Sequence, residues 1–304
     1  KSASIVCVRR AAGKSVPLVQ IAKVLMFVPE FITIRHADGY ESFARCWCGP
    51  SDQSRKAVLY FHGIQSHGEW FERSASRLAE AGAAVLMPDR RGSGRNTVDR
   101  GHTPSAARLI ADAIDAMEEL TRHSGCETVS LIGVSWGGKL ALNLANICPK
   151  RVASLSLVAP GLFPIVDLPT SAKVRVAWSA LMDRRRLFPI PINEPEMFTA
   201  NPDRIAYIRD DPLRLRDVTA SFLMASRKMD RCTAVARRQA GPPARLFLAE
   251  TDRIISNDAT RRWFRELNWP DSRILEYHGA HHTLEFEPEG CRFMDDLAAW
   301  VTGR

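Results

Sequence analysis

The sequence predicts an α/β fold: a doubly wound, mostly parallel β-sheet with an antiparallel N-terminal hairpin and an inserted helical cap. Short apolar runs alternate with helical patterns from residue 57 to residue 158. The alternation stops for about 80 residues and resumes at residue 245. Because strands separated by helices of this length pair in parallel, we expect both stretches to form one sheet that is interrupted once.

Each element has its own local signal. Residues 31–36 and 40–47 flank Ala-Asp-Gly, which is typical of a hairpin turn and predicts the antiparallel start. A helix is predicted at 18–28, because Pro17 suits its first turn and Pro29 stops it. Buried strands are predicted at 57–61, 83–87, 129–132, 152–158, 245–249 and 272–277. Further helices are predicted at 70–82, 105–121, 138–148, 259–267 and 291–301.

These patterns divide the chain into a core, residues 1–160 and 241–304, and a cap, residues 161–240. The cap segment contains seven prolines and is expected to form short helices. Its 14 Lys and Arg against 9 Asp and Glu contribute +5 of the chain's formal charge of +8. The cap therefore carries most of the excess positive charge.

Two features of the cap segment have both a structural and a functional interpretation. One is a group of five apolar residues: Val174, Val176, Trp178, Leu181 and Met182. We interpret most of them as residues that pack the cap onto the core, with an acyl chain as the alternative partner. The other is the arginine run 184–186, interpreted as a solvated cluster, with anionic lipid or a substrate phosphate or carboxylate as the alternative.

Composition excludes several classes of protein. Hydrophobic residues make up 45% and charged residues 25%, which excludes a disordered or collagen-like chain. No apolar run approaches the roughly 18 residues of a membrane span. The seven cysteines are scattered and odd in number, so we expect reduced thiols, Cys46 and Cys48 included, in a cytoplasmic protein. Because the chain begins at Lys1, the loss of an upstream signal or anchor stays open.

The strongest functional signal is a G-x-S-x-G pattern at residues 133–137, between a predicted strand and a predicted helix. The turn that joins them must be sharp, so small residues are needed on both sides of the serine, and Gly133 and Gly137 meet this need. Such a turn projects the Ser135 hydroxyl above the C-terminal edge of the sheet, near the positive end of the next helix. Ser135 is therefore the candidate nucleophile.

A serine hydroxyl needs a base to accept its proton and a carboxylate to orient that base. With this strand–turn–helix arrangement, the expected order along the chain is serine, acid, histidine. Asp252 follows the strand at 245–249 and is the candidate acid, with Glu250 as its substitute. Asp258 is interpreted as the residue that caps the next helix.

The loop after the strand at 272–277 supplies the candidate base. It contains three histidines, and small Gly279 and Ala280 let it approach the serine. His278 comes too early in the loop, and spacing alone leaves His281 and His282 open.

A further element follows the strand at 57–61. A tetrahedral intermediate places negative charge on the former carbonyl oxygen, which two backbone N–H groups can hold. We expect one donor to be the amide of Trp136, directly after the nucleophile, and the other to be the amide of Ile64, after His-Gly. His62 and His67 are interpreted as hydrogen-bonding residues that fix this loop.

Together these motifs resemble the α/β-hydrolase superfamily, in particular the monoacylglycerol lipase and lysophospholipase-like esterases. The resemblance covers roughly residues 40–160 and 240–300. It rests on the strand–turn–helix pattern at Ser135 and on four loops. These are an H-G-x-x-x-H-x-x-x-[FY] pattern at 62–71, a D-x-x-G-x-G pattern at 89–96, the acid loop at 249–254 and a G-A-x-H-x-L pattern at 279–284. The last motif implies that the base is His282.

The resemblance also implies that residues 161–240 form a helical cap over the active site. The segments at 197–202 and 207–213 resemble caps of bacterial members. Two departures from the family pattern stand out. Trp136 replaces the usual methionine, which is expected to narrow the acyl side of the pocket, and Ala249 replaces the usual leading glycine of the acid loop.

The predicted function is a serine carboxylic-ester hydrolase that acts through an acyl-enzyme. A thioesterase or acyltransferase with the same residues is the alternative, and a non-catalytic binding protein ranks lower because all three triad residues are present. The chemistry needs no cofactor, and no metal-ligand spacing such as H-E-x-x-H occurs. The expected partner is a small acyl ester or lipid, with transient contact to an anionic lipid surface. Nucleic acid is not expected, because the basic residues are dispersed and do not interleave with aromatics.

Overall fold

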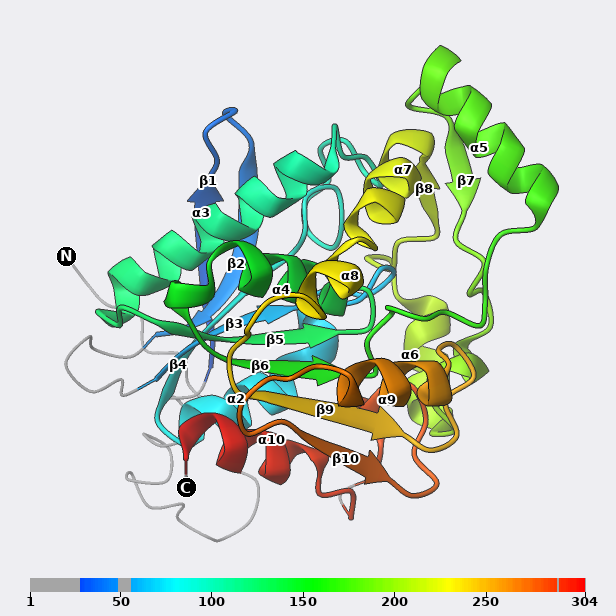
Figure 1. Ribbon diagram of the computed structural model, residues 1–304. Coiled ribbons are helices and arrows are strands. Elements are labelled where there is room, and N and C mark those ends of the chain that lie inside the picture. The colour runs from blue at the N-terminus through cyan, green and yellow to red at the C-terminus, as the bar shows by residue number, and fades with distance from the viewer. Residues whose placement is uncertain (1–27, 49–55, 289, 304) are drawn as a thin grey trace, which may run out of the picture.

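The computed structural model describes residues 28–48, 56–288 and 290–303. Its centre is an eight-stranded sheet in the order β1-β2-β4-β3-β5-β6-β9-β10 (Figure 1). The strands are β1 Glu30–Arg35, β2 Glu41–Trp47, β3 Lys56–Phe61, β4 Ala83–Pro88, β5 Val129–Val134, β6 Val152–Val158, β9 Ala244–Ala249 and β10 Arg273–Tyr277. The β1–β2 and β2–β4 pairs are antiparallel and the other pairs are parallel. The predicted fold class is confirmed.

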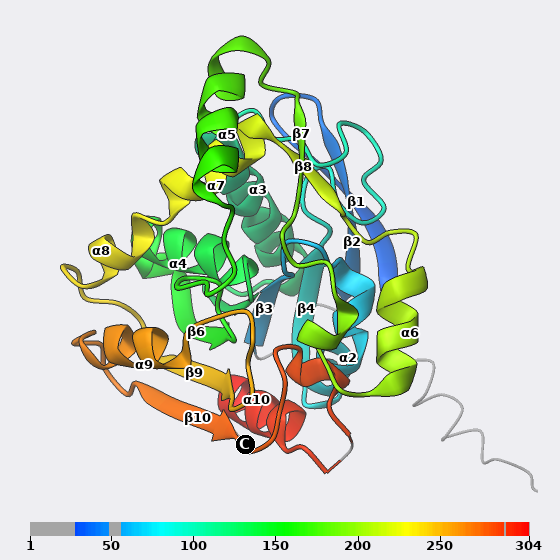
Figure 2. The same ribbon diagram turned by 90° about the vertical axis from the view of Figure 1, so that its right-hand side faces the viewer.

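Helices cover both faces of this sheet. They are α2 Glu72–Glu80, α3 Ala106–Ser124, α4 Gly137–Ile147, α9 Asn257–Arg265 and α10 Phe293–Thr302, with short 3₁₀ turns at Gly68–Phe71, Pro149–Arg151 and Leu284–Phe286. The helices α3, α4 and α9 lie on one face, and α2 and α10 pack together on the other (Figure 2). Strands covered on both faces are apolar throughout, and every residue of β4, β5 and β9 is buried.

The first part of the segment between β6 and β9 lies beyond the carboxyl ends of the parallel strands, and its last helix packs against α4 (Figure 1). It contains α5 Thr170–Met182, β7 Leu187–Pro189, a 3₁₀ turn at Pro195–Met197, α6 Pro202–Asp210, β8 Asp217–Thr219, α7 Ala220–Met229 and α8 Cys232–Ala236. Short helices were expected here, but the antiparallel pair of β7 and β8 was not. Three residues are too few for an alternating pattern to show, and Pro189 at the end of β7 weakens the strand signal.

Two local predictions were wrong. Cys46 and Cys48 were expected to be reduced, but they form a disulfide with their Cα atoms 5.3 Å apart. Residues two apart on a strand point to the same face, so the two sulfurs lie on the same side of the chain where they can bond. Asp258 does not cap α9; instead the Ser256 side chain accepts the Ala259 N–H.

The helix predicted at 18–28 lies outside the described residues except for Val28. Among the residues that are described, no helix has the length and apolar character that a membrane span requires.

Candidate active site

Ser135 lies in a strained turn between β5 and α4. Its φ angle is +51°, in the left-handed region that non-glycine residues rarely adopt. A Cβ at Gly137 would lie 2.4 Å from the Phe61 carbonyl oxygen, and one at Gly133 would lie 2.7 Å from the Gly137 carbonyl oxygen. The two glycines are therefore needed for close packing, as the sequence predicted. Backbone hydrogen bonds from Ser135 to Val158 and from Gly161 to Ser135 hold the turn.

The structure brings His282 and Asp252 to this serine. The His282 Nε2 atom lies 2.9 Å from Ser135 Oγ, and its Nδ1 lies 2.7 Å from Asp252 Oδ2. The side chains of His282 and Asp252 are 2% and 0% exposed. The other carboxylate oxygen, Oδ1, accepts the N–H groups of Ile254 and Ile255. A carboxylate held in this way accepts a hydrogen bond from the Nδ1–H of His282, which leaves Nε2 unprotonated and able to accept the proton of Ser135.

The competing residues make other contacts. Glu250 accepts the Gly279 N–H at 2.8 Å and pairs with the exposed His278. The hydrogen bond from Gly279 and then the contact with His278 hold the pKa of Glu250 below its usual range. His281 pairs instead with Glu287, through both its backbone N–H and its ring. None of these side chains has a hydrogen bond to Ser135.

The loop after β3 lies against the nucleophile. A Cβ built at Gly63 would touch Ser135 Cβ at 3.4 Å. Within the described chain, the backbone N–H groups of Ile64 and Trp136 donate to no protein acceptor. Such N–H groups are available to a negatively charged oxygen at this place.

His62 fixes this loop in its neutral form. Its Nδ1 donates to the Gly63 carbonyl oxygen, and its Nε2 accepts the Arg90 backbone N–H. Burial and then the neighbouring Arg90 hold the pKa of His62 well below its usual range. Both ring nitrogens are therefore occupied, which agrees with the interpretation of His62 as a residue that fixes the loop.

Asp211, for which the sequence predicted no role, ties the segment between β6 and β9 to the site. Asp211 follows α6, and its Oδ2 accepts His67 Nε2 at 2.9 Å and Trp70 Nε1 at 2.8 Å. Burial raises the pKa of Asp211, but these hydrogen bonds outweigh it and hold the pKa below its usual range. Since His67 and Trp70 belong to the loop after β3, this buried carboxylate ties the insertion to the loop that faces Ser135.

A small, mostly apolar cavity opens at the nucleophile. It is lined by Gly63, Ile64, Gln65, Ser66, Trp70, Phe71, Val134, Ser135, Ile192, Phe198, His282 and Thr283. The Trp136 ring was expected to narrow this pocket, but it lines a different cavity, next to Arg90 and Leu140. There its indole N–H donates to Ser226 of α7, and its ring packs on Phe222.

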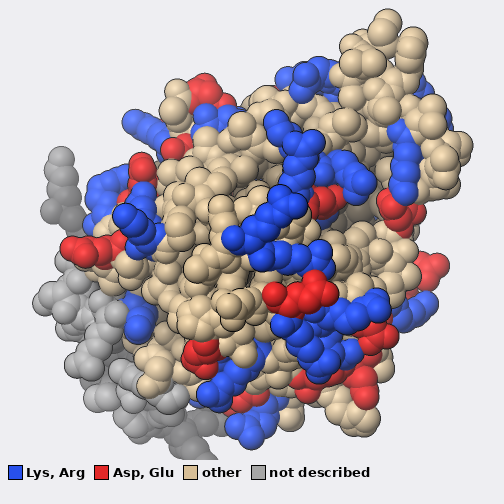
Figure 3. All heavy atoms as spheres, viewed as in Figure 1, with Lys and Arg blue, Asp and Glu red and all other residues tan. Residues whose placement is uncertain are grey.

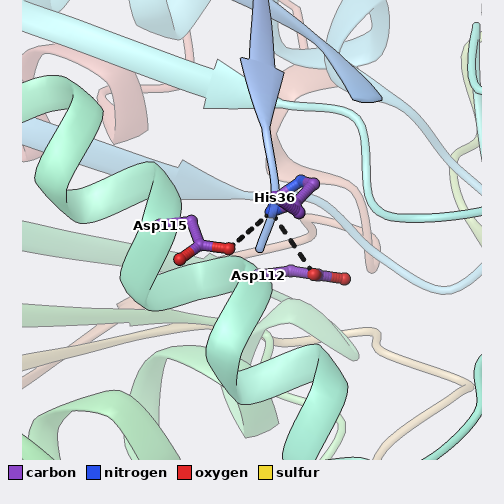
Figure 4. A group of neighbouring side chains, drawn as sticks. All are labelled: His36, Asp112 and Asp115. Atoms are coloured by element: carbon purple, nitrogen blue, oxygen red, sulfur yellow. Dashed lines mark hydrogen bonds and ion pairs between the residues drawn. The ribbon is translucent and has the colours of Figure 1, made fainter. Parts of the chain in front are cut away.

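A second cluster, of His36, Asp112 and Asp115, brings together groups that are able to bind a metal (Figure 4). His36 Nδ1 lies 2.8 Å from Asp115 and 3.3 Å from Asp112. Arg91 and Arg108 donate to the same Asp112 carboxylate at 2.7–2.8 Å, and Arg108 also pairs with Asp115. Two arginines already neutralise these carboxylates, so the cluster is an ion-pair network that joins the β1–β2 hairpin to α3.

Known proteins provide independent information on the same chain. A family model described as "Serine aminopeptidase, S33" matches residues 52–289, more than half of the sequence. The uncharacterised protein YnbC of Escherichia coli is 22% identical over 88% of this chain, but the match spans only 46% of YnbC. Human monoglyceride lipase is 23% identical over 88% of this chain and 89% of its own length. The crystal structure of a monoacylglycerol lipase from Paleococcus ferrophilus superposes with a TM-score of 0.77, at 24% identity, over 87% of this chain and 99% of that one.

Proposed function

The chain belongs to the serine aminopeptidase S33 family of α/β-hydrolases and is therefore a serine hydrolase; on that premise, we propose that it cleaves carboxylic esters through an acyl-enzyme. Ser135 is the nucleophile, His282 the general base, and Asp252 the acid that orients the histidine. The backbone N–H groups of Ile64 and Trp136 hold the oxyanion. The observation that carries this proposal is the unbroken hydrogen-bonded chain from Ser135 through His282 to Asp252, at 2.9 and 2.7 Å.

The reaction proceeds in two halves. Ser135 Oγ attacks the acyl carbon while His282 Nε2 takes its proton, and the carbonyl oxygen becomes an oxyanion. As the oxyanion reverts to a carbonyl, the ester C–O bond breaks and His282 returns the proton to the leaving alkoxide. Water then attacks the acyl-enzyme while His282 accepts one of its protons; as the bond between the acyl carbon and Ser135 Oγ breaks, His282 returns the proton to Oγ and the free acid leaves.

The proposed substrate class is a small acyl ester or lipid. The cavity at Ser135 offers apolar walls from Trp70, Phe71, Ile192 and Phe198. Two of the proteins similar to this chain are named monoglyceride or monoacylglycerol lipases. A thioesterase or acyltransferase is the second candidate, because the same residues serve an acyl-enzyme whose acceptor is not water.

We also propose that residues 161–240 form the cap, with α5 in transient contact with anionic lipid. Of the group of five apolar residues on α5, only Val176 is buried. The other four are exposed and lie at helical spacing: Val174, Trp178, Leu181 and Met182. The interpretation that most of this group packs the cap onto the core was therefore wrong. Figure 3 shows the part of the surface around α5 as mainly uncharged, with Lys and Arg beside it. Exposed apolar patches flanked by cations suit the interface of an anionic lipid layer.

Two of the three arginines at 184–186 are engaged within the protein, so they are less available to anionic lipid than the alternative interpretation of this run requires. Arg184 donates to the Pro104 carbonyl oxygen and to Ser221, and Arg185 pairs with Asp99. The cytoplasmic location predicted from reduced thiols stays a prediction. It has lost part of its basis, because disulfides such as Cys46–Cys48 are rare in that compartment.

A series of p-nitrophenyl esters from short to long acyl chains, together with a fluorophosphonate probe, tests the proposal. We expect hydrolysis and labelling by the wild type and neither by Ser135→Ala. Labelling without hydrolysis of any ester would favour the acyltransferase. Hydrolysis that persists in a folded Ser135→Ala variant would refute the proposed nucleophile.

A further inference from the structure

Arg90 is a buried cation that lacks a carboxylate partner among the described residues. It is 8% exposed, and its guanidinium donates to two backbone carbonyl oxygens, those of Gly63 at 3.1 Å and Ile64 at 3.0 Å. Its Nε has no hydrogen-bond partner. The next residue, Arg91, is buried to the same degree but pairs with Asp112 and Asp38. The buried carboxylate of Asp89 acts on Arg90 through its charge but forms no hydrogen bond with it, and a buried cation without a direct ion pair is costly.

The carbonyl that Arg90 holds belongs to the peptide unit that carries the proposed oxyanion donor. The Gly63 carbonyl and the Ile64 N–H lie at opposite ends of one planar trans peptide, so fixing the direction of one fixes the other. Arg90 Nη1 and His62 Nδ1 both donate to the Gly63 oxygen. A cationic donor at the carbonyl end also polarises the amide and strengthens its N–H as a donor.

Arg90 also contacts the residue that supplies the second proposed donor. Its guanidinium carbon lies 4.7 Å from the ring centre of Trp136 and 5.0 Å from that of Phe222. Phe222 comes from α7, so the cation is held between the core and the insertion. At such distances an arginine over an aromatic face is attracted to the ring. One side chain thus touches both Ile64 and Trp136.

We propose that Arg90 is the positioning residue of the oxyanion site: it aims the Ile64 amide and braces Trp136. The inference rests on the proposed function. Burial lowers the pKa of Arg90 to about 9, so at neutral pH the side chain keeps its charge and donates charge-assisted hydrogen bonds to the two carbonyl oxygens.

The test compares Arg90→Gln and Arg90→Lys with Arg91→Gln as the matched control. The control removes a neighbouring buried arginine from the same loop, but one that makes no contact with residues 63, 64 or 136. Each variant is assayed for kcat and KM on a p-nitrophenyl ester. The affinities for a trifluoromethyl ketone, which forms a tetrahedral adduct, and for the matching secondary alcohol, which does not, are measured in parallel.

We expect Arg90→Gln to lower kcat by about 10- to 100-fold, less than the loss of a direct oxyanion donor, with KM changed by less than about threefold. Affinity for the trifluoromethyl ketone should fall in parallel with kcat, while affinity for the alcohol stays the same. Arg90→Lys, which keeps the charge but not the two-pronged contact, should lie between. Arg91→Gln should lower the melting temperature but leave kcat within about twofold of the wild type.

Several results would overturn the inference. They are an unchanged kcat in Arg90→Gln, an equal loss of affinity for ketone and alcohol, or an equal loss of kcat in Arg91→Gln. If Arg90→Gln does not fold, Arg90→Lys decides by the same criteria. If the wild type hydrolyses none of the esters but is labelled, the rate of fluorophosphonate labelling replaces kcat. A wild type that is neither labelled nor active would refute the proposed function itself. An active wild type whose kcat is unchanged in the Arg90 variants would refute only the role of Arg90.

Discussion

Glu285 provides a quantitative prediction, because it is a carboxyl buried on the loop that carries His282. It is 2% exposed, its Oε1 accepts the Ser74 N–H at 2.9 Å, and its Oε2 has no partner among the described residues. Burial raises its pKa from 4.5 to about 7. Each pH unit of such a difference corresponds to about 1.4 kcal/mol, so ionising Glu285 inside the fold costs about 3 kcal/mol.

The sign of the effect follows from proton linkage. The folded state binds this proton more tightly than the unfolded chain, so its contribution to stability is present at low pH and is lost as the pH rises from 4.5 to about 7. Glu285→Gln keeps the acceptor for Ser74 and removes the ionisation. The variant should match the wild type near pH 4 and exceed it by about 3 kcal/mol near pH 8.5.

Urea unfolding followed by tryptophan fluorescence, at a series of pH values, measures this difference. Other groups titrate in both proteins, so only the difference between the two curves reports on Glu285. Glu276→Gln is the control, because it makes the same chemical change at a carboxylate that is partly exposed and paired with Arg261. A Glu285→Gln difference that is independent of pH, or that favours the wild type at high pH, would refute the reasoning.

Three further predictions follow from individual contacts. Asp252→Asn should lower kcat on the order of 10⁴-fold with the fold intact, since the amide no longer favours the Nδ1–H tautomer of His282; steady-state kinetics and circular dichroism test this. Asp211→Ala should lower the free energy of unfolding by about 2–4 kcal/mol, because two buried donors, on His67 and Trp70, lose their acceptor; a loss below about 0.5 kcal/mol would contradict it. Trp178→Ser should weaken sedimentation with vesicles of anionic phospholipid but leave kcat on a short soluble ester unchanged, whereas equal binding by both proteins would exclude α5 as the contact.

The sheet and the turn at Ser135 could be predicted because their signals are local. Buried strands are continuous apolar runs, and a strained strand–helix turn requires glycine at 133 and 137. Within residues 28–48, 56–288 and 290–303, the strands and helices of the core agree with the predicted ranges to within a few residues. The short β7–β8 pair escaped because three-residue strands have no periodicity.

The candidate site was less accessible, because it depends on contacts between distant segments. Spacing left His281 and His282 open, and resemblance rather than geometry favoured His282. Arg90 contacts Gly63, which is 27 positions away in the sequence, and Asp211 contacts His67, which is 144 positions away. No local sequence pattern predicts contacts of this kind. The prediction for Cys46 and Cys48 failed because the odd number and scattered positions of the cysteines were given more weight than the proximity of these two, which alternate like strand neighbours.

The central claim is an acyl-enzyme on Ser135, and trapping that intermediate tests it most directly. The protein would be mixed with a p-nitrophenyl ester, quenched in acid within the first turnover, digested, and examined by mass spectrometry. We expect a burst of nitrophenol and one acylated peptide, which contains Ser135, with neither in Ser135→Ala. Hydrolysis without an acylated peptide, or acylation at another residue that persists in Ser135→Ala, would exclude an acyl-enzyme on Ser135.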